Sequence, residues 1–203
     1  MDRQRRLALG LAAVAAAMVV LFVVPSGYFA AATVGATSVM LAAGYYCGLR
    51  PGRPKPSALL AGVVGAAALY LIFYLGAAAI DAYHPLGITS ASEASIYSLI
   101  TSKSNPIYVQ VGVLVFDSAG YESFFRGVLQ NRLGPRLGIG SVPAVALVDS
   151  AIHVVTLNPV WVVATFVTDL AWGLTCRYGR GTQASFTSHL VWDLAIFIIR
   201  PVT

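Results

Sequence analysis

The chain has 203 residues, of which 58% are hydrophobic and only 10% are charged, and its formal net charge is +5. This composition excludes an ordinary soluble domain, and it indicates an all-α, polytopic membrane protein. The 13 Lys and Arg residues fall mainly in short clusters between apolar runs. Because no solvated basic face is visible, nucleic acid is not an expected partner.

Seven apolar segments are long enough, or nearly so, to cross a bilayer as helices. They cover residues 7–24, 28–49, 57–80, 107–129, 139–157, 160–176 and 183–199. Pro and Gly clusters between them are typical helix ends. We expect a single membrane domain over 1–203, in which 1–80 carries no ionisable side chain in its span interiors and serves as scaffold. Residues 107–203 would carry the functional site.

The segment 81–106 is rich in Ser and Thr, and its apolar residues are irregularly spaced. We predict an external loop that contains a short amphipathic helix lying on the membrane surface. With the N-terminus in the cytoplasm and seven crossings, four basic clusters all fall on the cytoplasmic side, as the positive-inside rule requires. This orientation places the C-terminus outside. The first apolar run is longer than the core of a signal peptide, so we expect an uncleaved anchor.

The C-terminal half contains a surplus of ionisable side chains inside apolar segments. Five of the eight acidic residues and two of the three histidines lie there: Asp117, Glu122, Asp149, Asp169, Asp193, His153 and His189. An ionisable group inside a membrane costs about 3 kcal/mol or more on insertion scales, so it marks a functional site by default. The sequence therefore predicts a buried polar site.

Three segments carry a polar pair spaced four residues apart. These pairs are Glu122 with Arg126, Asp149 with His153, and His189 with Asp193. Residues at this spacing share one face of an α-helix, and in lipid that face must point into the bundle. We therefore expect the three pairs to face one another.

The order of these motifs resembles the CPBP family, which comprises type II CAAX prenyl proteases and bacteriocin-processing enzymes. The resemblance rests on Glu122-x-x-Phe-Arg126-Gly, a histidine one span later, and His189-x-x-x-Asp193 in the last span. It covers about 111–199, and Trp172-Gly also fits the pattern. It implies an intramembrane endopeptidase that hydrolyses a peptide or prenylated protein within the bilayer and needs no cofactor.

The resemblance also implies roles for individual residues. His153 would help to hold the attacking water, and His189 and Asp193 would form or orient the oxyanion site. Arg126 would be the arginine of the first motif. The family has two adjacent glutamates there, and the water-activating first one is replaced by Tyr121.

Because the first glutamate of the motif is replaced, the identity of the catalytic carboxylate stays open. Glu122 is either a catalytic carboxylate or the counter-ion that a buried Arg126 demands. Asp149 is the best candidate for a relocated base, because it shares a helix face with His153, although it would alternatively fix the tautomer of that histidine. Asp117, one turn before Tyr121, is the second candidate.

Two more side chains keep alternative roles. Asp169 either faces the cavity from its own span or pairs with Arg126. Tyr121 is either a hydrogen-bond donor to an oxyanion or a structural residue.

Three functions therefore compete. The first is a peptidase with a relocated base. The second is a lipid or isoprenoid hydrolase that uses a divalent metal such as zinc, since carboxylates and imidazoles suit such ions. Its ligands would be His153, His189, Asp149 and Asp193. The third is a catalytically inactive relative that binds a membrane peptide or partner protein.

Overall fold

Helices account for nearly all of the residues that the computed structural model describes, which are 2–50, 52–53, 55–83, 94, 96–97 and 105–200. No β-strand occurs among these residues, which confirms the predicted all-α class. The predicted surface helix within 81–106 falls mostly outside the described residues.

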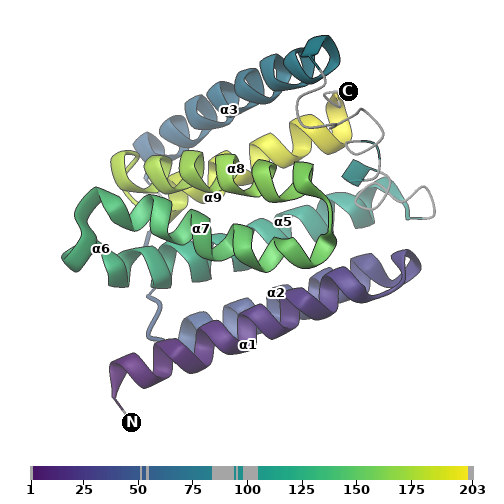
Figure 1. Cartoon of the computed structure of the whole chain (residues 1–203). Helices are drawn as coiled ribbons and strands as arrows, with labels where there is room; N and C mark the ends of the chain where they lie inside the picture. Colours follow the sequence, from purple (N-terminus) through teal and green to yellow (C-terminus); the bar gives the residue numbers. More distant parts are fainter. Residues whose placement is uncertain are drawn as a thin grey trace.

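Each of the seven predicted segments coincides with a helix (Figure 1). The helices are α1 (Arg3–Val23), α2 (Phe29–Tyr46), α3 (Pro56–Tyr83), α5 (Ile107–Phe124), α7 (Ser141–His153), α8 (Pro159–Tyr178) and α9 (Thr182–Asp193). A π-helical segment continues α5 over Phe125–Gln130, and another continues α9 over Leu194–Ile199. The short helix α6 (Asn131–Leu137) was not predicted, because Gly134 and Pro135 within it are typical of a loop.

Five helical segments are long and apolar enough to cross a membrane, namely Arg3–Val23, Ser26–Tyr46, Pro56–Ile80, Ile107–Thr156 and Pro159–Tyr178. The chain is thus an integral, multi-pass membrane protein. The 50-residue segment Ile107–Thr156 contains two arms, since the chain turns back between α5 and α7 at α6. The helix α9 and its π-helical continuation fall outside this set, so the count of seven crossings remains a prediction.

The start of α8 shows how local sequence fixes these boundaries. The Asn158 side chain accepts hydrogen bonds from the backbone N–H groups of Val160 and Trp161, and Pro159 occupies the first helical position. Pro is favoured there because its missing N–H would have no partner in the helix. Leu157 turns the chain with a φ of 53°. The predicted break at Asn158-Pro159 is therefore confirmed.

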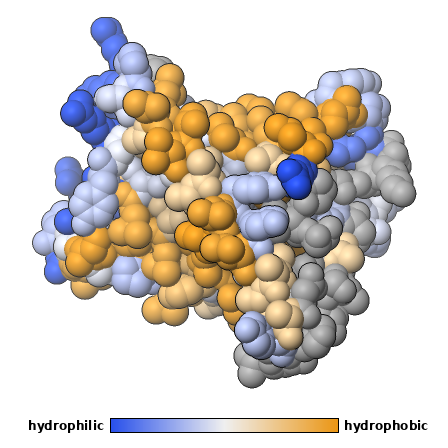
Figure 2. Space-filling model, turned by 90° about the horizontal axis from the view of Figure 1, so that it is seen from above, coloured by the Kyte–Doolittle hydropathy of each residue, from blue (hydrophilic) through white to orange (hydrophobic). Residues whose placement is uncertain are grey.

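The helices that carry the predicted site lie in the middle of the bundle (Figure 1). The α1–α2 pair packs on α5 at one side, and α3 packs on α9 at the other, while α7 and α8 pack on each other. Large apolar side chains cover the outside, as on α3, where Leu60 is 67% exposed. Figure 2 shows such side chains across one face, with hydrophilic groups gathered mainly at the end that holds α6. This outward apolar surface is suited to lipid.

Glycines allow α3 to approach α9 closely. A Cβ added to Gly62 would lie 2.5 Å from the Cβ of Thr187 and 2.6 Å from the carbonyl oxygen of Ala184. A Cβ on Gly65 would lie 3.0 Å from Ser188 Oγ. Small residues at such positions let helix backbones pack tightly in a membrane.

We predict that Gly62→Ala lowers the free energy of unfolding by about 1–3 kcal/mol, because the methyl group would force α3 and α9 apart. The matched control is Gly76→Ala in the same helix, since nothing among the described residues lies within 4 Å of its added Cβ. Thermal unfolding of the two purified variants in detergent measures the difference. Equal losses in both variants would contradict this account of the α3–α9 contact.

Candidate active site

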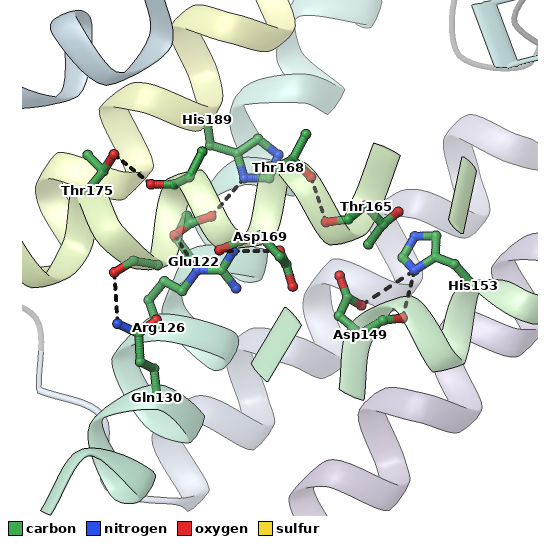
Figure 3. Close-up of polar contacts among 12 residues, drawn as sticks. Glu122, Arg126, Gln130, Asp149, His153, Thr165, Thr168, Asp169, Thr175 and His189 are labelled. Carbon is green, nitrogen blue, oxygen red and sulfur yellow. Dashed lines mark hydrogen bonds and ion pairs between the residues drawn. The ribbon is translucent and has the colours of Figure 1, made fainter. Parts of the chain in front are cut away.

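The guanidinium of Arg126 lies at the centre of the buried polar site (Figure 3). The side chain is 0% exposed and comes from the π-helical segment after α5. Its Nη2 donates to Asp169 Oδ1 on α8, and its Nε lies 3.6 Å from Glu122 Oε2 on α5. Two carboxylates from two helices therefore compensate one buried cation, and Asp169 is the closer of the two.

The second oxygen of Glu122 binds a histidine on another helix. His189 Nδ1 on α9 lies 3.0 Å from Glu122 Oε1, and because a carboxylate only accepts, the ring nitrogen donates this hydrogen bond. The other ring nitrogen, Nε2, lies 3.5 Å from Asp193 Oδ2. Trp172 stacks on the ring with a centroid distance of 3.6 Å and an interplanar angle of 15°. The position and the plane of the imidazole are therefore both fixed.

Two hydroxyl groups lie against further carboxylates beside this histidine. Thr37 on α2 donates to Asp117 Oδ1 at 3.0 Å. Ser118 Oγ donates to the backbone oxygen of Leu114 at 2.8 Å and lies 3.4 Å from Asp193 Oδ2. Because Thr37 comes from the predicted scaffold, that part of the chain also contributes a polar contact to the site.

Asp149 and His153 form a second group, apart from Glu122 and His189 in Figure 3. His153 Nδ1 donates to the backbone oxygen of Asp149 at 3.0 Å and lies 3.5 Å from its Oδ1. Asp149 is 0% exposed, and neither of its carboxyl oxygens has a hydrogen-bond donor among the described residues. The carboxyl group of Asp149 neighbours that of Asp169. Because Asp169 also pairs with Arg126, it links the Asp149–His153 group to the Glu122–His189 group.

A cavity of about 350 Å³ opens beside both groups and has a largely apolar wall. Its polar and ionisable lining includes Asp117, Tyr121, His153, His189 and Asp193. The described wall does not include Glu122, Arg126, Asp149 or Asp169, which lie behind it. The ionisable side chains thus fall into two sets, one that a ligand in the cavity can reach and one that is sealed away.

The structure gives no support to the alternative in which a divalent metal is bound by His153, His189, Asp149 and Asp193. Among the described residues, no three His, Cys, Asp or Glu side chains converge closely enough to hold a metal ion. His153 and Asp149 belong to one group, while His189 and Asp193 belong to the other.

The structure brings all three predicted pairs into one buried region, but they do not meet at a single point. Sequence reasoning missed Thr37, Ser118 and Trp172 as contacts of the site. Thr37 and Ser118 give no signal of their own, because hydroxyl residues are common in membrane helices. Trp172 precedes a glycine in the motif, but its stacking on His189 depends on how α8 and α9 pack.

This fold and site define a multi-pass membrane protein with a buried His–carboxylate centre beside an apolar cavity. Residues 103–195 match a family model described as Rce1-like, that is, Type II CAAX prenyl endopeptidase Rce1-like. This match confirms the resemblance inferred from the motifs. No curated protein and no solved structure matches the chain.

We predict that Asp169→Asn lowers the free energy of unfolding by about 3–5 kcal/mol, because it leaves the buried Arg126 short of its closest counter-charge. Glu122→Gln removes the more distant counter-charge and should cost less. Asp2→Asn is the matched control, since Asp2 is exposed at the start of α1 and Asn caps a helix equally well. Thermal unfolding in detergent compares the three variants. A larger loss for Glu122→Gln than for Asp169→Asn would show that the ion pairs are ranked wrongly.

Proposed function

We propose that this chain is an intramembrane endopeptidase of the CAAX-protease type, with its N-terminus in the cytoplasm. The observation that carries the proposal is the apolar cavity with Asp117, His189 and Asp193 in its wall. Such a cavity suits an extended or lipidated peptide, and its few polar groups suit an amide bond. The match over 103–195 to a family model for prenyl endopeptidases supports the same reaction class.

Asp117 is the general base in this proposal, ahead of Asp149. Asp117 is half-buried and lines the cavity, whereas Asp149 is fully buried behind the described wall. Thr37 holds one oxygen of Asp117, which leaves the other to accept a proton from water. Asp117 also lies one helical turn before Tyr121, so its carboxylate serves the region where the family places the first glutamate.

Hydrolysis then proceeds in two balanced steps. The water oxygen bonds to the amide carbon while the water gives a proton to Asp117, and the carbonyl oxygen becomes an oxyanion. The C–N bond then breaks, and the leaving nitrogen takes the proton from Asp117. His189, which has a carboxylate beside each ring nitrogen, is suited to donate a hydrogen bond to the oxyanion.

Further donors lie around the same cavity. The indole N–H groups of Trp172 and Trp192 are buried, lack an acceptor among the described residues, and belong to side chains in the wall. A buried donor without an acceptor is costly, so a substrate carbonyl is a suitable partner. Tyr121, also in the wall, adds a hydroxyl group. These donors would bind the peptide backbone or the oxyanion.

The test compares Asp117→Asn with Asp149→Asn in lipid nanodiscs, using a quenched fluorogenic farnesylated peptide as the probe. We expect Asp117→Asn to reduce kcat by about 100-fold or more, as loss of a general base does. Asp149→Asn should keep kcat within about tenfold, since Asp149 does not line the cavity. The reverse order would overturn the assignment of Asp117 and restore Asp149 as the base.

A second candidate function is a catalytically inactive relative that binds a membrane peptide. The observation that favours it is the sealing of Glu122, which is 1% exposed, with its two oxygens facing Arg126 and His189. Tyr121 occupies the position of the family's water-activating glutamate, so neither residue of that pair presents a carboxylate to the cavity.

Tyr121→Glu separates the two candidates. If the wild-type chain is the inactive relative, it binds the farnesylated peptide without cleaving it, and Tyr121→Glu creates cleavage. If the chain is the proposed peptidase, the wild type cleaves, and product formation in H₂¹⁸O places one ¹⁸O atom in the new carboxyl group. Tyr121→Phe is the control for loss of the hydroxyl group alone. Mass spectrometry of the products gives both readouts.

A further inference from the structure

A second cavity, of about 380 Å³, lies at the end of the bundle that carries the arginines, and the proposed peptidase chemistry does not use it. It opens between the start of α6, the start of α7 and the turn from α8 to α9. Its lining includes Gln130, Asn131, Ser141, Arg177, Arg180 and Gly181. Arg177 lies in the last turn of α8 and Arg180 lies in the turn from α8 to α9, and the buried site gives neither residue a role.

The charge around this cavity favours an anion. Arg177 and Arg180 are exposed and line it. The backbone N–H of Lys55 donates to the Gln183 side chain, whose Nε2 donates in turn to the oxygen of Gly52, so the basic loop before α3 is held against the first turn of α9. Apart from the carboxylates of the buried site, the acidic side chain that the structure describes at this end of the bundle is Asp2, which caps α1. Basic side chains therefore dominate the described surface around the cavity.

The first turn of α9 adds backbone donors. Gly181 precedes the helix with a φ of 111°, and no side chain caps it among the described residues. The first N–H groups of a helix lack partners within the helix, and the helix dipole makes them favourable for an anion. Since α9 has 12 residues before its π-helical continuation, this is a substantial helix end.

The buried side-chain oxygen of Gln130 is a separate observation that indicates a ligand in this cavity. Gln130 is 5% exposed, and its Oε1 has no donor among the described residues. Its Nε2 donates to the oxygen of Gly173 at 2.9 Å, so the orientation of the amide is fixed. A buried acceptor of this kind is costly unless a ligand donates to it. The ligand should therefore carry both an anionic group and a hydroxyl group.

We propose that this cavity binds the headgroup of an anionic phospholipid with a free hydroxyl group, as in phosphatidylglycerol. The phosphate lies between Arg177, Arg180 and the start of α9, and a glycerol hydroxyl donates to Gln130 Oε1. A lipid is the occupant because the cavity lies at the end of the apolar helices, where membrane headgroups would be expected. Basic pockets between membrane helices are suited to such headgroups.

The test titrates the full-length protein in detergent with dioctanoyl phosphatidylglycerol and follows binding by native mass spectrometry. We expect saturable binding of one lipid, with weaker binding of dioctanoyl phosphatidylcholine. Dioctanoyl phosphatidylmethanol has the same charge but no hydroxyl group, and it should bind several-fold more weakly than phosphatidylglycerol. Inorganic phosphate should not compete at equal concentration. Equal affinity for all three lipids, or effective competition by phosphate, would overturn the proposal.

Matched variants locate the site. Arg177→Gln and Arg180→Asn should each weaken phosphatidylglycerol binding about fivefold, since one basic residue near the membrane surface contributes about 1 kcal/mol. Asn is chosen because Arg180 has a φ of 72°, which Asn tolerates. Arg136→Gln is the control, because Arg136 is exposed at the same end but lies outside the described lining. A loss in Arg136→Gln equal to the other two would show nonspecific attraction and sink the proposal.

Discussion

The buried charge of Arg126 is the constraint on which the rest of the site depends. A guanidinium inside a membrane protein needs compensating charge, and here it comes from Asp169 on α8 and Glu122 on α5. Because Glu122 also accepts from His189 on α9, one cation ties three helices together and fixes the orientation of the imidazole. The need to compensate the charge of Arg126 therefore also determines how Glu122 and His189 are placed in the site.

This constraint divides the carboxylates by role. Glu122 and Asp169 are committed to Arg126 and are sealed behind the cavity wall, whereas Asp117 and Asp193 line the cavity itself. The match of residues 103–195 to a prenyl endopeptidase family model supports the proposal of peptide hydrolysis. In that proposal, Tyr121 stands where a first motif glutamate would be expected. A carboxylate one turn earlier on the same helix is the economical replacement. Glu122 and Asp169, by contrast, compensate the charge of Arg126, and a relative that only binds peptides would need them for the same structural reason.

Much of this arrangement was predictable, because membrane helices leave strong patterns. Long apolar runs and Pro-Gly breaks located seven helices, and the spacing of His189 and Asp193 placed both on one face. The partner of Arg126 stayed open, since Asp169 lies 43 residues away and only helix packing brings it near. Local patterns also carry no sign of the π-helical segment that holds Arg126, or of the hydrogen bond from Thr37 on α2.

The position of a bound transition-state mimic tests the central claim most directly. A lipidated peptide aldehyde forms a hydrated carbonyl that imitates the tetrahedral intermediate, and its place can be determined by cryo-electron microscopy of the complex. Our account predicts that one hydrate oxygen lies within about 3 Å of the Asp117 carboxylate and the other within reach of His189. A hydrate bound against Asp149 and His153, or a peptide bound outside the cavity, would contradict it.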